Sequence, residues 1–174
     1  MRPQDKLKVL HEAIDQRAKT LEDKHAAFLT CKRGCSDCCR DELTVFSVEA
    51  NRIRTYLEQS QTRLLIHPEG SCAFLNPRDK SCQIYEARPY VCRTQGLPLR
   101  FFEETDEGLA EFRDICPLND NESAPIEALP ADDCWEIGPT ESDLYGLTRE
   151  ESTLDPITSR VALRALAMQV DAEK

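Results

Sequence analysis

Nine cysteines are the residues of this 174-residue sequence that are best suited to chemistry. They run Cys31-x3-Cys35-x2-Cys38-Cys39, Cys72-x9-Cys82-x9-Cys92, Cys116 and Cys134. Spacings of two and three residues let one tight loop aim several thiolates at one centre, and in a zinc site each sulfur lies about 2.3 Å from the metal. More distant cysteines can complete the shell. Four thiolates suit a tetrahedral zinc ion and a four-iron cluster equally well.

The spacing leaves the number of metal centres open. Eight thiolates would fill two four-thiolate sites, or would hold one cluster with thiols to spare. The adjacent residues Cys38 and Cys39 project in different directions, so we expect them to serve different centres or different roles. The pairing of the other cysteines does not follow from the sequence.

Disulfide bonds are the main alternative use for so many cysteines, and three features weigh against them. The count is odd, which leaves at least one thiol over. Cys35, Cys38 and Cys39 are crowded together, which favours convergence on one point over separate bridges. The first residues also lack the apolar stretch of a secretory signal. We therefore expect reduced cysteines in a cytoplasmic protein.

Charged residues are distributed unevenly along the chain, whose net charge is −10. Residues 1–100 contain 17 basic and 13 acidic residues, whereas residues 101–155 contain 2 basic and 17 acidic residues. Seven of the nine cysteines lie in the basic part, where cations lower the pKa of thiols and stabilise thiolates. The acidic stretch is expected to be a solvated surface or a docking face for a basic protein partner.

Composition argues against two classes of partner. A nucleic acid needs a basic surface, which a chain of net charge −10 does not offer. A membrane span needs about eighteen consecutive apolar residues, and the sequence has no such run. The expected partners are therefore a metal ion or cluster and a protein at the acidic stretch, with no nucleic acid and no membrane.

A long amphipathic helix is predicted over residues 4–29, and Pro3 suits its first turn. Apolar residues recur there at spacings of three, four and seven, namely Leu7, Leu10, Ile14, Leu21 and Phe28. Residues 43–46 are expected to form a short strand. Ser47 is the expected N-cap of a second helix that ends near Gln59. The residues expected on its buried face are Val48, Ile53, Tyr56 and Leu57.

Two hairpins are predicted in the middle of the chain. Residues 72–75 and 81–85 flank the polar turn Asn76-Pro-Arg-Asp-Lys80, which would place one cysteine in each arm. Residues 97–102 and 109–115 flank an acidic turn that ends at a glycine. A helical turn is expected between the two hairpins, ending at the third of the regularly spaced cysteines.

The last third of the chain is expected to combine an irregular segment with two helices. Residues 117–139 contain four prolines and are predicted to be irregular. Helices are expected near residues 139–150 and 156–171. The residues that the last helix should bury are Ile157, Val161, Leu166 and Val170.

The predicted fold class is α+β, with a long N-terminal helix, short hairpins and C-terminal helices around a small irregular core. We expect metal to stabilise that core. The predicted organisation is a single domain over residues 1–174, with a cysteine-cluster core at 30–98 and an acidic, helical part at 99–174.

The segment Cys31-Lys-Arg-Gly-Cys35-Ser-Asp-Cys38-Cys39 resembles the signature of the bacterial YkgJ family of zinc- or iron-chelating cysteine-cluster proteins. The resemblance continues over about residues 31–98, through Glu49, Cys72-Ala-Phe-Leu75, Cys82-Gln-Ile-Tyr85 and Arg88-Pro89-Tyr-Val-Cys92-Arg93. It implies no settled reaction. Flagellin lysine methylases have a similar cysteine pattern but are much larger, so their activity transfers poorly. The metal ligands that the resemblance implies are Cys31, Cys35, Cys38, Cys39, Cys72, Cys82, Cys92 and, as the eighth, Cys116.

Basic residues near the cysteines are candidates to surround a cluster, namely Lys32, Arg33, Arg40, Arg88 and Arg93. Their charge would offset the thiolates, and their N–H groups would donate hydrogen bonds to sulfur, which raises a cluster's potential. The alternative for each is an ordinary surface cation. Glu49 is expected as a first-turn helix residue and not as a ligand, and Tyr85 as a core residue with a hydrogen-bonded hydroxyl.

The remaining candidate residues receive structural roles. His11, His25 and His67 do not lie at metal-ligand spacing, so no ligand role is assigned to them. Cys134 is expected to be the odd free thiol, acting as a small core residue.

The favoured function is that of a zinc or iron–sulfur protein acting in electron transfer, redox chemistry or metal handling. The all-thiolate set and the basic surroundings favour an iron–sulfur cluster over Zn²⁺. One alternative is a structural zinc domain that mediates protein–protein interaction, in which the metal supplies folding free energy.

The other alternative is a small iron–sulfur enzyme, so whether the chain is an enzyme is left open. Cys31, Cys35 and Cys38 have the CxxxCxxC spacing with which radical S-adenosylmethionine enzymes hold a four-iron cluster. Against this, Asp37 stands where those enzymes usually have an aromatic residue, and the chain lacks the alternating strands and helices of their partial barrel. Asp37 also disfavours a dithiol oxidoreductase, since an acidic neighbour opposes thiolate formation.

Overall fold

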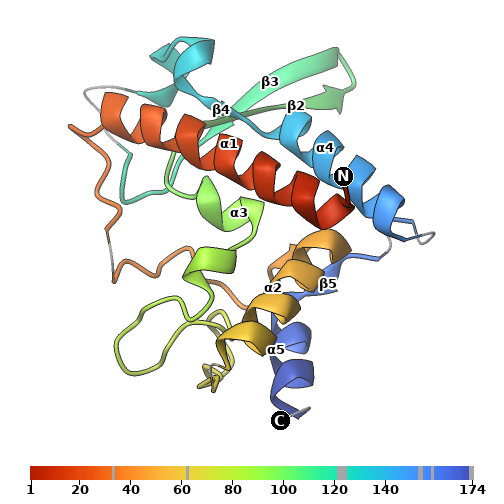
Figure 1. The fold of residues 1–174 in the computed structure, drawn as a ribbon. Coiled ribbons are helices and arrows are strands. Elements are labelled where there is room, and N and C mark those ends of the chain that lie inside the picture. The colour runs from red at the N-terminus through yellow and green to blue at the C-terminus, as the bar shows by residue number, and fades with distance from the viewer. Residues whose placement is uncertain (33, 62, 121–124, 153–154, 158, 173–174) are drawn as a thin grey trace.

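Helices and short strands are mixed along the chain in its computed structural model, and the fold class is α+β as predicted (Figure 1). The structure describes residues 1–32, 34–61, 63–120, 125–152, 155–157 and 159–172. Its helices are α1 (Pro3–Lys24), α2 (Ser47–Ser60), α3 (Tyr90–Arg93), α4 (Ile137–Glu151) and α5 (Leu163–Ala172). Its strands are β1 (Thr44–Val45), β2 (Leu99–Thr105), β3 (Gly108–Asp114), β4 (Trp135–Glu136) and β5 (Val161–Ala162). No helix in these ranges is long and apolar enough to cross a membrane.

Helix α1 begins at Pro3, one residue before the predicted start and with the proline in its first turn as expected, but it ends at Lys24 and not at residue 29. Its buried face consists of Leu7, His11, Ile14, Ala18 and Leu21, which recur every three or four residues. The helix ends because His25 leaves the helical conformation and turns its ring toward another segment, where Nε2 donates to the carbonyl of Asp133 at 2.8 Å. A turn over residues 25–28 follows.

Helix α2 is capped by a different residue from the one predicted. The N-cap is Phe46, whose backbone is extended and whose carbonyl accepts the N–H groups of Glu49 and Ala50. Ser47 is the first helical residue, and its hydroxyl is buried without a hydrogen-bond partner among the described residues. The prediction of Ser47 as N-cap is therefore wrong, because the chain stays extended through Phe46 after β1.

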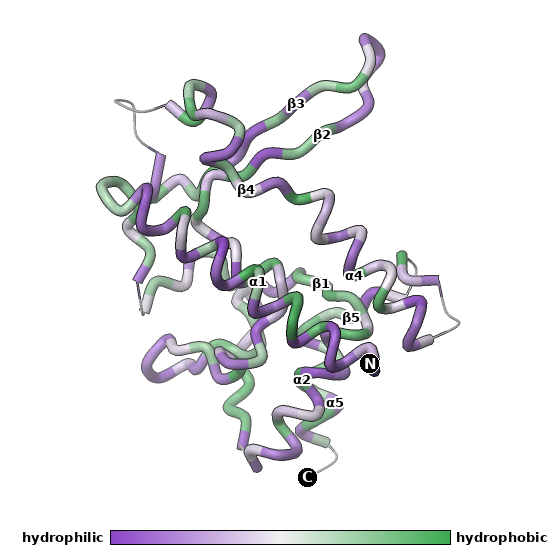
Figure 2. Tube along the Cα trace, turned by 45° about the horizontal axis from the view of Figure 1, so that its top comes forward, coloured by the Kyte–Doolittle hydropathy of each residue, from purple (hydrophilic) through white to green (hydrophobic). Residues whose placement is uncertain are grey.

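The strands form two small sheets. β1 pairs antiparallel with β5, and the predicted hairpin is present as the antiparallel pair β2–β3. β4 adds to β2 in parallel, with Trp135 opposite Leu99. The β2–β3 hairpin projects from the body of the molecule (Figure 2). Residues 117–139 are less irregular than predicted, since 3₁₀ turns over Ile126–Ala128 and Ala131–Asp133 precede β4.

Two hydrophobic clusters hold the helices together, and α2 contributes to both. The first cluster joins α2 to α5, and its fully buried side chains include Ile53, Leu57, Phe74, Ile84, Leu163 and Leu166. The second cluster joins α1 to α4, and its fully buried side chains include Leu7, Leu21, Val48 and Leu144. The buried face predicted for α2 is therefore present, with Tyr56 partly buried against the first cluster.

Helix α5 begins at Leu163 and not near residue 156. Leu166 and Val170 are buried as predicted. The predicted burial of Ile157 is wrong, since its side chain is 70% exposed, and Val161 lies half-buried in β5 and not in the helix. The reason is the pairing of β5 with β1, which keeps the chain before α5 extended.

Glu49 joins α1, α2 and α3 through a buried carboxylate. Its Oε1 accepts the backbone N–H of Tyr90 at 2.6 Å and the Nε2–H of His11 at 3.2 Å. The change Glu49→Ala would leave both buried donors without an acceptor, so we expect the free energy of unfolding to fall by about 3 kcal/mol. Urea unfolding measures this loss. Glu58→Ala, at an exposed position of α2, is the control, and an equal loss there would contradict a role of the buried contacts.

Candidate metal centre

The first four cysteines lie in a loop of tight turns that follows α1. The backbone N–H of Cys35 bonds to the carbonyl of Lys32 at 2.9 Å, and that of Cys39 bonds to the carbonyl of Ser36 at 2.9 Å. Gly34 has a φ of +94°, a conformation that glycine adopts at low cost. The short spacings of this segment therefore correspond to two turns, each of which ends at a cysteine.

Main-chain hydrogen bonds bring the later cysteines to this loop. The N–H of Cys72 bonds to the carbonyl of Cys39 at 2.8 Å. Cys82 forms an antiparallel bridge with Leu75, so the arms of the first predicted hairpin do pair, through a single bridge. Cys92 lies in α3, and the helical turn predicted before it is present as two pieces, a 3₁₀ turn followed by α3. The cysteine loop and the bridged segments that carry Cys72 and Cys82 therefore lie side by side.

We call Cys39, Cys72, Cys82 and Cys92 the inner thiol group. Burial raises the pKa of Cys92, and the charges of Cys72 and Cys82 raise it further. Burial likewise raises the pKa of Cys82 and that of Cys72. The charges of Cys72 and Cys92 also contribute to the raised pKa of Cys39, after its hydrogen bond to Cys38 and its burial. Because charges act strongly only over short distances, these four sulfurs lie near one another, and Cys38 lies near them as well, since its charge also acts on Cys82 and Cys92.

We call Cys31, Cys35, Cys38 and Cys116 the outer thiol group. Cys31 is exposed on one side, but its partial burial still raises its pKa. The charges of the other three members act in the same direction. Cys116, far from the loop in sequence, is therefore close to it in space. The sequence alone did not reveal this grouping.

Cys38 and Cys39 lie where the two groups meet. The Cys39 thiol donates a hydrogen bond to Cys38, and this bond lowers the pKa of Cys38 and raises that of Cys39. The charge of Arg40 also lowers the pKa of Cys38. Cys38 is thus the member of the pair that more readily becomes a thiolate. The assignment of the two cysteines to different centres stays a prediction.

The donor set fits a thiophilic metal, whereas the side-chain positions are those of free thiols. All nine cysteines are free. No three His, Cys, Asp or Glu side chains in the described part of the chain converge closely enough to hold a metal ion. Clustered, partly buried thiols are nevertheless the ligands that zinc and iron–sulfur centres take. Because burial raises the pKa of the inner thiols, a metal would have to displace their protons.

Asn119 holds the outer thiol group in place, and it was missed in the sequence. Its side chain is 1% exposed. Its Nδ2 donates to the carbonyl of Gly96 at 2.8 Å and to the sulfur of Cys31 at 3.3 Å. Its Oδ1 accepts the backbone N–H of Thr30 at 2.8 Å, and its own N–H bonds to the carbonyl of Cys116 at 2.7 Å. One buried residue therefore connects the cysteine loop to two distant segments.

The change Asn119→Asp keeps the acceptor oxygen but replaces the N–H donors with a second carboxylate oxygen. That oxygen would face the Gly96 carbonyl and the Cys31 sulfur, so we expect the free energy of unfolding to fall by about 2 kcal/mol. Urea unfolding measures the effect. Asn76→Asp is the matched control, because the side-chain oxygen of Asn76 accepts the N–H of Arg78 and is retained in the variant. Equal losses in the two variants would argue against a special role for Asn119.

Besides Arg40, which acts on Cys38, Arg88 is a predicted cation whose charge acts on a thiol. Burial raises the pKa of Cys82, and the positive charge of Arg88 offsets part of this rise. Arg93 is engaged elsewhere: its guanidinium pairs with Asp15 at 2.5 Å, and its Nε donates to the carbonyl of Arg88 at 2.9 Å. The two arginines therefore have different roles: Arg88 acts electrostatically on Cys82, as Arg164 does on Cys72, whereas Arg93 pairs with Asp15.

Tyr85 does not lie in the core. Its side chain is 58% exposed, so the predicted buried position is wrong. The Arg88 guanidinium lies 4.1 Å from the centre of its ring, and this cation–π contact at the surface replaces burial. Of the other cations considered, Lys32 is exposed, and Arg33 lies outside the described residues.

Two histidines are more important to the structure than the sequence suggested. His11 and His25 are buried, and each has a polar partner, the Glu49 carboxylate and the Asp133 carbonyl respectively. The signal for His11 was its place on the apolar face of α1. Cys134 is buried as expected, with its pKa raised by burial.

Comparison with known proteins agrees with the chemistry of the thiols. A family model described as "Putative zinc- or iron-chelating domain" matches residues 30–117, just over half of the chain. The matched segment contains the inner and outer thiol groups and ends before Cys134. No curated protein and no solved structure matches the chain. The chain therefore belongs to the CxxCxxCC family of zinc- or iron-chelating domains.

Proposed function

We propose that the inner and the outer thiol group each hold an iron–sulfur cluster and that the chain acts in electron transfer, redox chemistry or metal handling. The proposal is supported by the closeness of the free thiols, whose charges act on one another's pKa values. Membership of a zinc- or iron-chelating family supports the class of metal. The proposed ligands are Cys31, Cys35, Cys38, Cys39, Cys72, Cys82, Cys92 and Cys116.

The chain's own residues would hold such a cluster in a partly dry environment. When bound, an iron–sulfur cluster supplies one-electron transfer. Cys72 is buried in the cluster of side chains that joins α2 to α5, with Cys39 and Cys82 packed against it, so water has little access to the inner thiol group. The Nδ2–H of Asn119 fixes the orientation of Cys31 in the outer thiol group.

Two contacts favour iron over zinc. Hydrogen bonds to cysteine sulfur and nearby positive charge tune the potential of an iron–sulfur cluster, whereas zinc has no redox chemistry to tune. Asn119 supplies such a hydrogen bond to Cys31, and Arg88 supplies positive charge near Cys82. The absence of histidine from the proposed ligand set is consistent with this choice.

The test is the content of metal and acid-labile sulfide per chain, measured on protein purified without oxygen. We expect iron with a matching amount of sulfide and a visible absorption band that bleaches on reduction. Zinc without sulfide would replace the iron proposal with the alternative below. Full structure and undiminished stability with neither metal would overturn the proposal altogether.

The alternative is a structural zinc domain that binds another protein through the acidic residues 101–155. The packing of Cys72 within the hydrophobic cluster of α2 and α5 favours it, because a metal there would add directly to folding free energy. Unfolding on chelation together with the absence of any redox transition would support this alternative over an electron carrier.

A further inference from the structure

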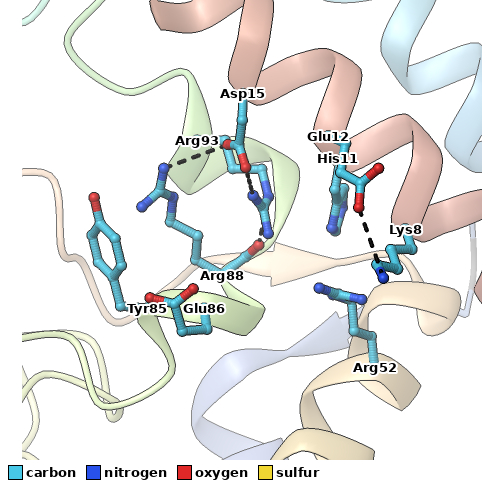
Figure 3. A pocket seen from close by; sticks show the side chains of 9 residues that line it. All are labelled: Lys8, His11, Glu12, Asp15, Arg52, Tyr85, Glu86, Arg88 and Arg93. Carbon is cyan, nitrogen blue, oxygen red and sulfur yellow. Dashed lines mark hydrogen bonds and ion pairs between the residues drawn. The ribbon is translucent and has the colours of Figure 1, made fainter.

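A pocket of about 230 Å³ lies between α1, α2 and the segment that carries α3 (Figure 3). Four of its lining residues carry cationic groups that bind anions, namely Lys8, Arg52, Arg88 and Arg93. Arg88 and Arg93 come from the same segment as Cys92, so the pocket adjoins the proposed metal centre along the chain. None of the functions considered above makes use of it.

Two of the guanidinium groups share one carboxylate. Asp15 pairs with Arg93 at 2.5 Å and with Arg88 at 3.5 Å, as Figure 3 shows. One negative charge therefore faces two positive charges. The Nε–H of Arg88 is buried and has no hydrogen-bond partner among the residues that the structure describes.

Arg52 has no partner of its own on the opposite side of the pocket. Its side chain makes neither a hydrogen bond nor an ion pair with any described residue, and its Nε–H is buried. Burial lowers the pKa of Arg52, and the like charge of Arg93 lowers it further. Arginines that are removed from water are normally paired. Arg52 is half-buried and makes no ion pair with a described residue, so its guanidinium is available to bind an anion.

The charges of Glu12 and Asp15 raise the pKa of Arg52, but no acidic residue described in the pocket makes a direct ion pair with it. Glu12 is within 3.9 Å of the Lys8 ammonium. Glu86 is exposed at the rim. Behind the pocket, the carboxylate of Glu49 is occupied by His11 and by the backbone of Tyr90. The positive charge of Arg52 is therefore the one left without a direct ion pair in the described part of the pocket.

We propose that this pocket binds a small oxyanion, a phosphate or a carboxylate group, at the guanidinium of Arg52, with the positive charge of Arg93 nearby. Guanidinium groups bind both kinds of oxyanion through paired N–H donors. The volume of about 230 Å³ accommodates a small molecule and excludes a folded partner. Such a ligand would bind next to the segment that carries Cys92, and its binding does not depend on which metal the cysteines hold.

The test is calorimetric titration of the full chain, as purified, with inorganic phosphate and, separately, with acetate. We expect saturable binding of at least one of them. The change Arg52→Gln should weaken this binding by about tenfold or more, because the anion loses a charged donor. Phosphate binding alone would identify the ligand as phosphorylated, and acetate binding alone would identify it as a carboxylic acid.

The control is Arg54→Gln on the same helix. Arg54 does not line the pocket and instead donates to Asn51 at 2.7 Å, so its replacement should leave anion binding unchanged. Arg52→Gln removes no hydrogen bond found in the structure, so this variant should fold, and thermal unfolding with and without phosphate gives a second readout. The proposal is overturned if the unmodified chain binds neither anion, or if Arg52→Gln binds as tightly as Arg54→Gln.

Discussion

The change Cys92→Ser is expected to lower the metal content of the chain by about half, because one of two four-thiol groups loses a ligand. Cys92 is the member of the inner thiol group on which the charges of Cys72, Cys82 and Cys38 all act. Binding of a structural metal contributes on the order of 10 kcal/mol to folding, so we also expect a stability loss of several kcal/mol. Metal analysis and urea unfolding on the same sample measure both effects.

Cys134→Ala is the matched control for this substitution. Cys134 is also a buried cysteine, but it lies outside the segment that matches the family, and the charges that act on it come from ionic side chains and not from other thiols. Its replacement should therefore retain the full metal content. Equal losses of metal in the two variants would remove the basis for the inner thiol group.

The parts of the fold that the sequence predicted correctly are those determined by neighbouring residues. Helix α1 was predicted from the spacing of its own apolar residues. The β2–β3 hairpin was predicted from the acidic turn that directly joins its two strands. The strand predicted over residues 43–46 is present as β1. By contrast, β5 was not predicted, because its two residues are extended only through pairing with β1, which lies far away along the chain. The early start predicted for the last helix has the same origin, since that pairing keeps Val161 extended.

The candidate site shows the same division. The cysteines could be named from type and spacing, but their division into two groups depends on contacts between distant segments, such as the hydrogen bond from Cys72 to Cys39. Asn119 could not be found, because nothing in the residues around it indicates a buried amide that contacts Cys31. The exposure of Tyr85 likewise depends on a tertiary contact, with Arg88.

Gly96→Ala is expected to weaken metal binding by the outer thiol group by about tenfold or more. Gly96 lies against Cys31, and an added Cβ would overlap the Cys31 sulfur and lie 3.3 Å from the Nδ2 of Asn119. The Cys31 sulfur would therefore have to leave its present position near Cys35, Cys38 and Cys116. Competition with a chelator measures the change in affinity.

Gly70→Ala is the control that separates the effect of the Cβ–Cys31 contact from the effect of backbone strain. Gly70 has a φ of +96° against +92° for Gly96, so both variants carry a similar strain, about 1–2 kcal/mol. A Cβ at Gly70 would meet nothing within 4 Å. Any additional loss of metal affinity in Gly96→Ala therefore reports on Cys31. Equal metal affinity in the two variants would mean that Cys31 is not a ligand. A loss of affinity confined to Gly96→Ala would mean that metal binding requires the close contact between the Gly96 backbone and the Cys31 sulfur.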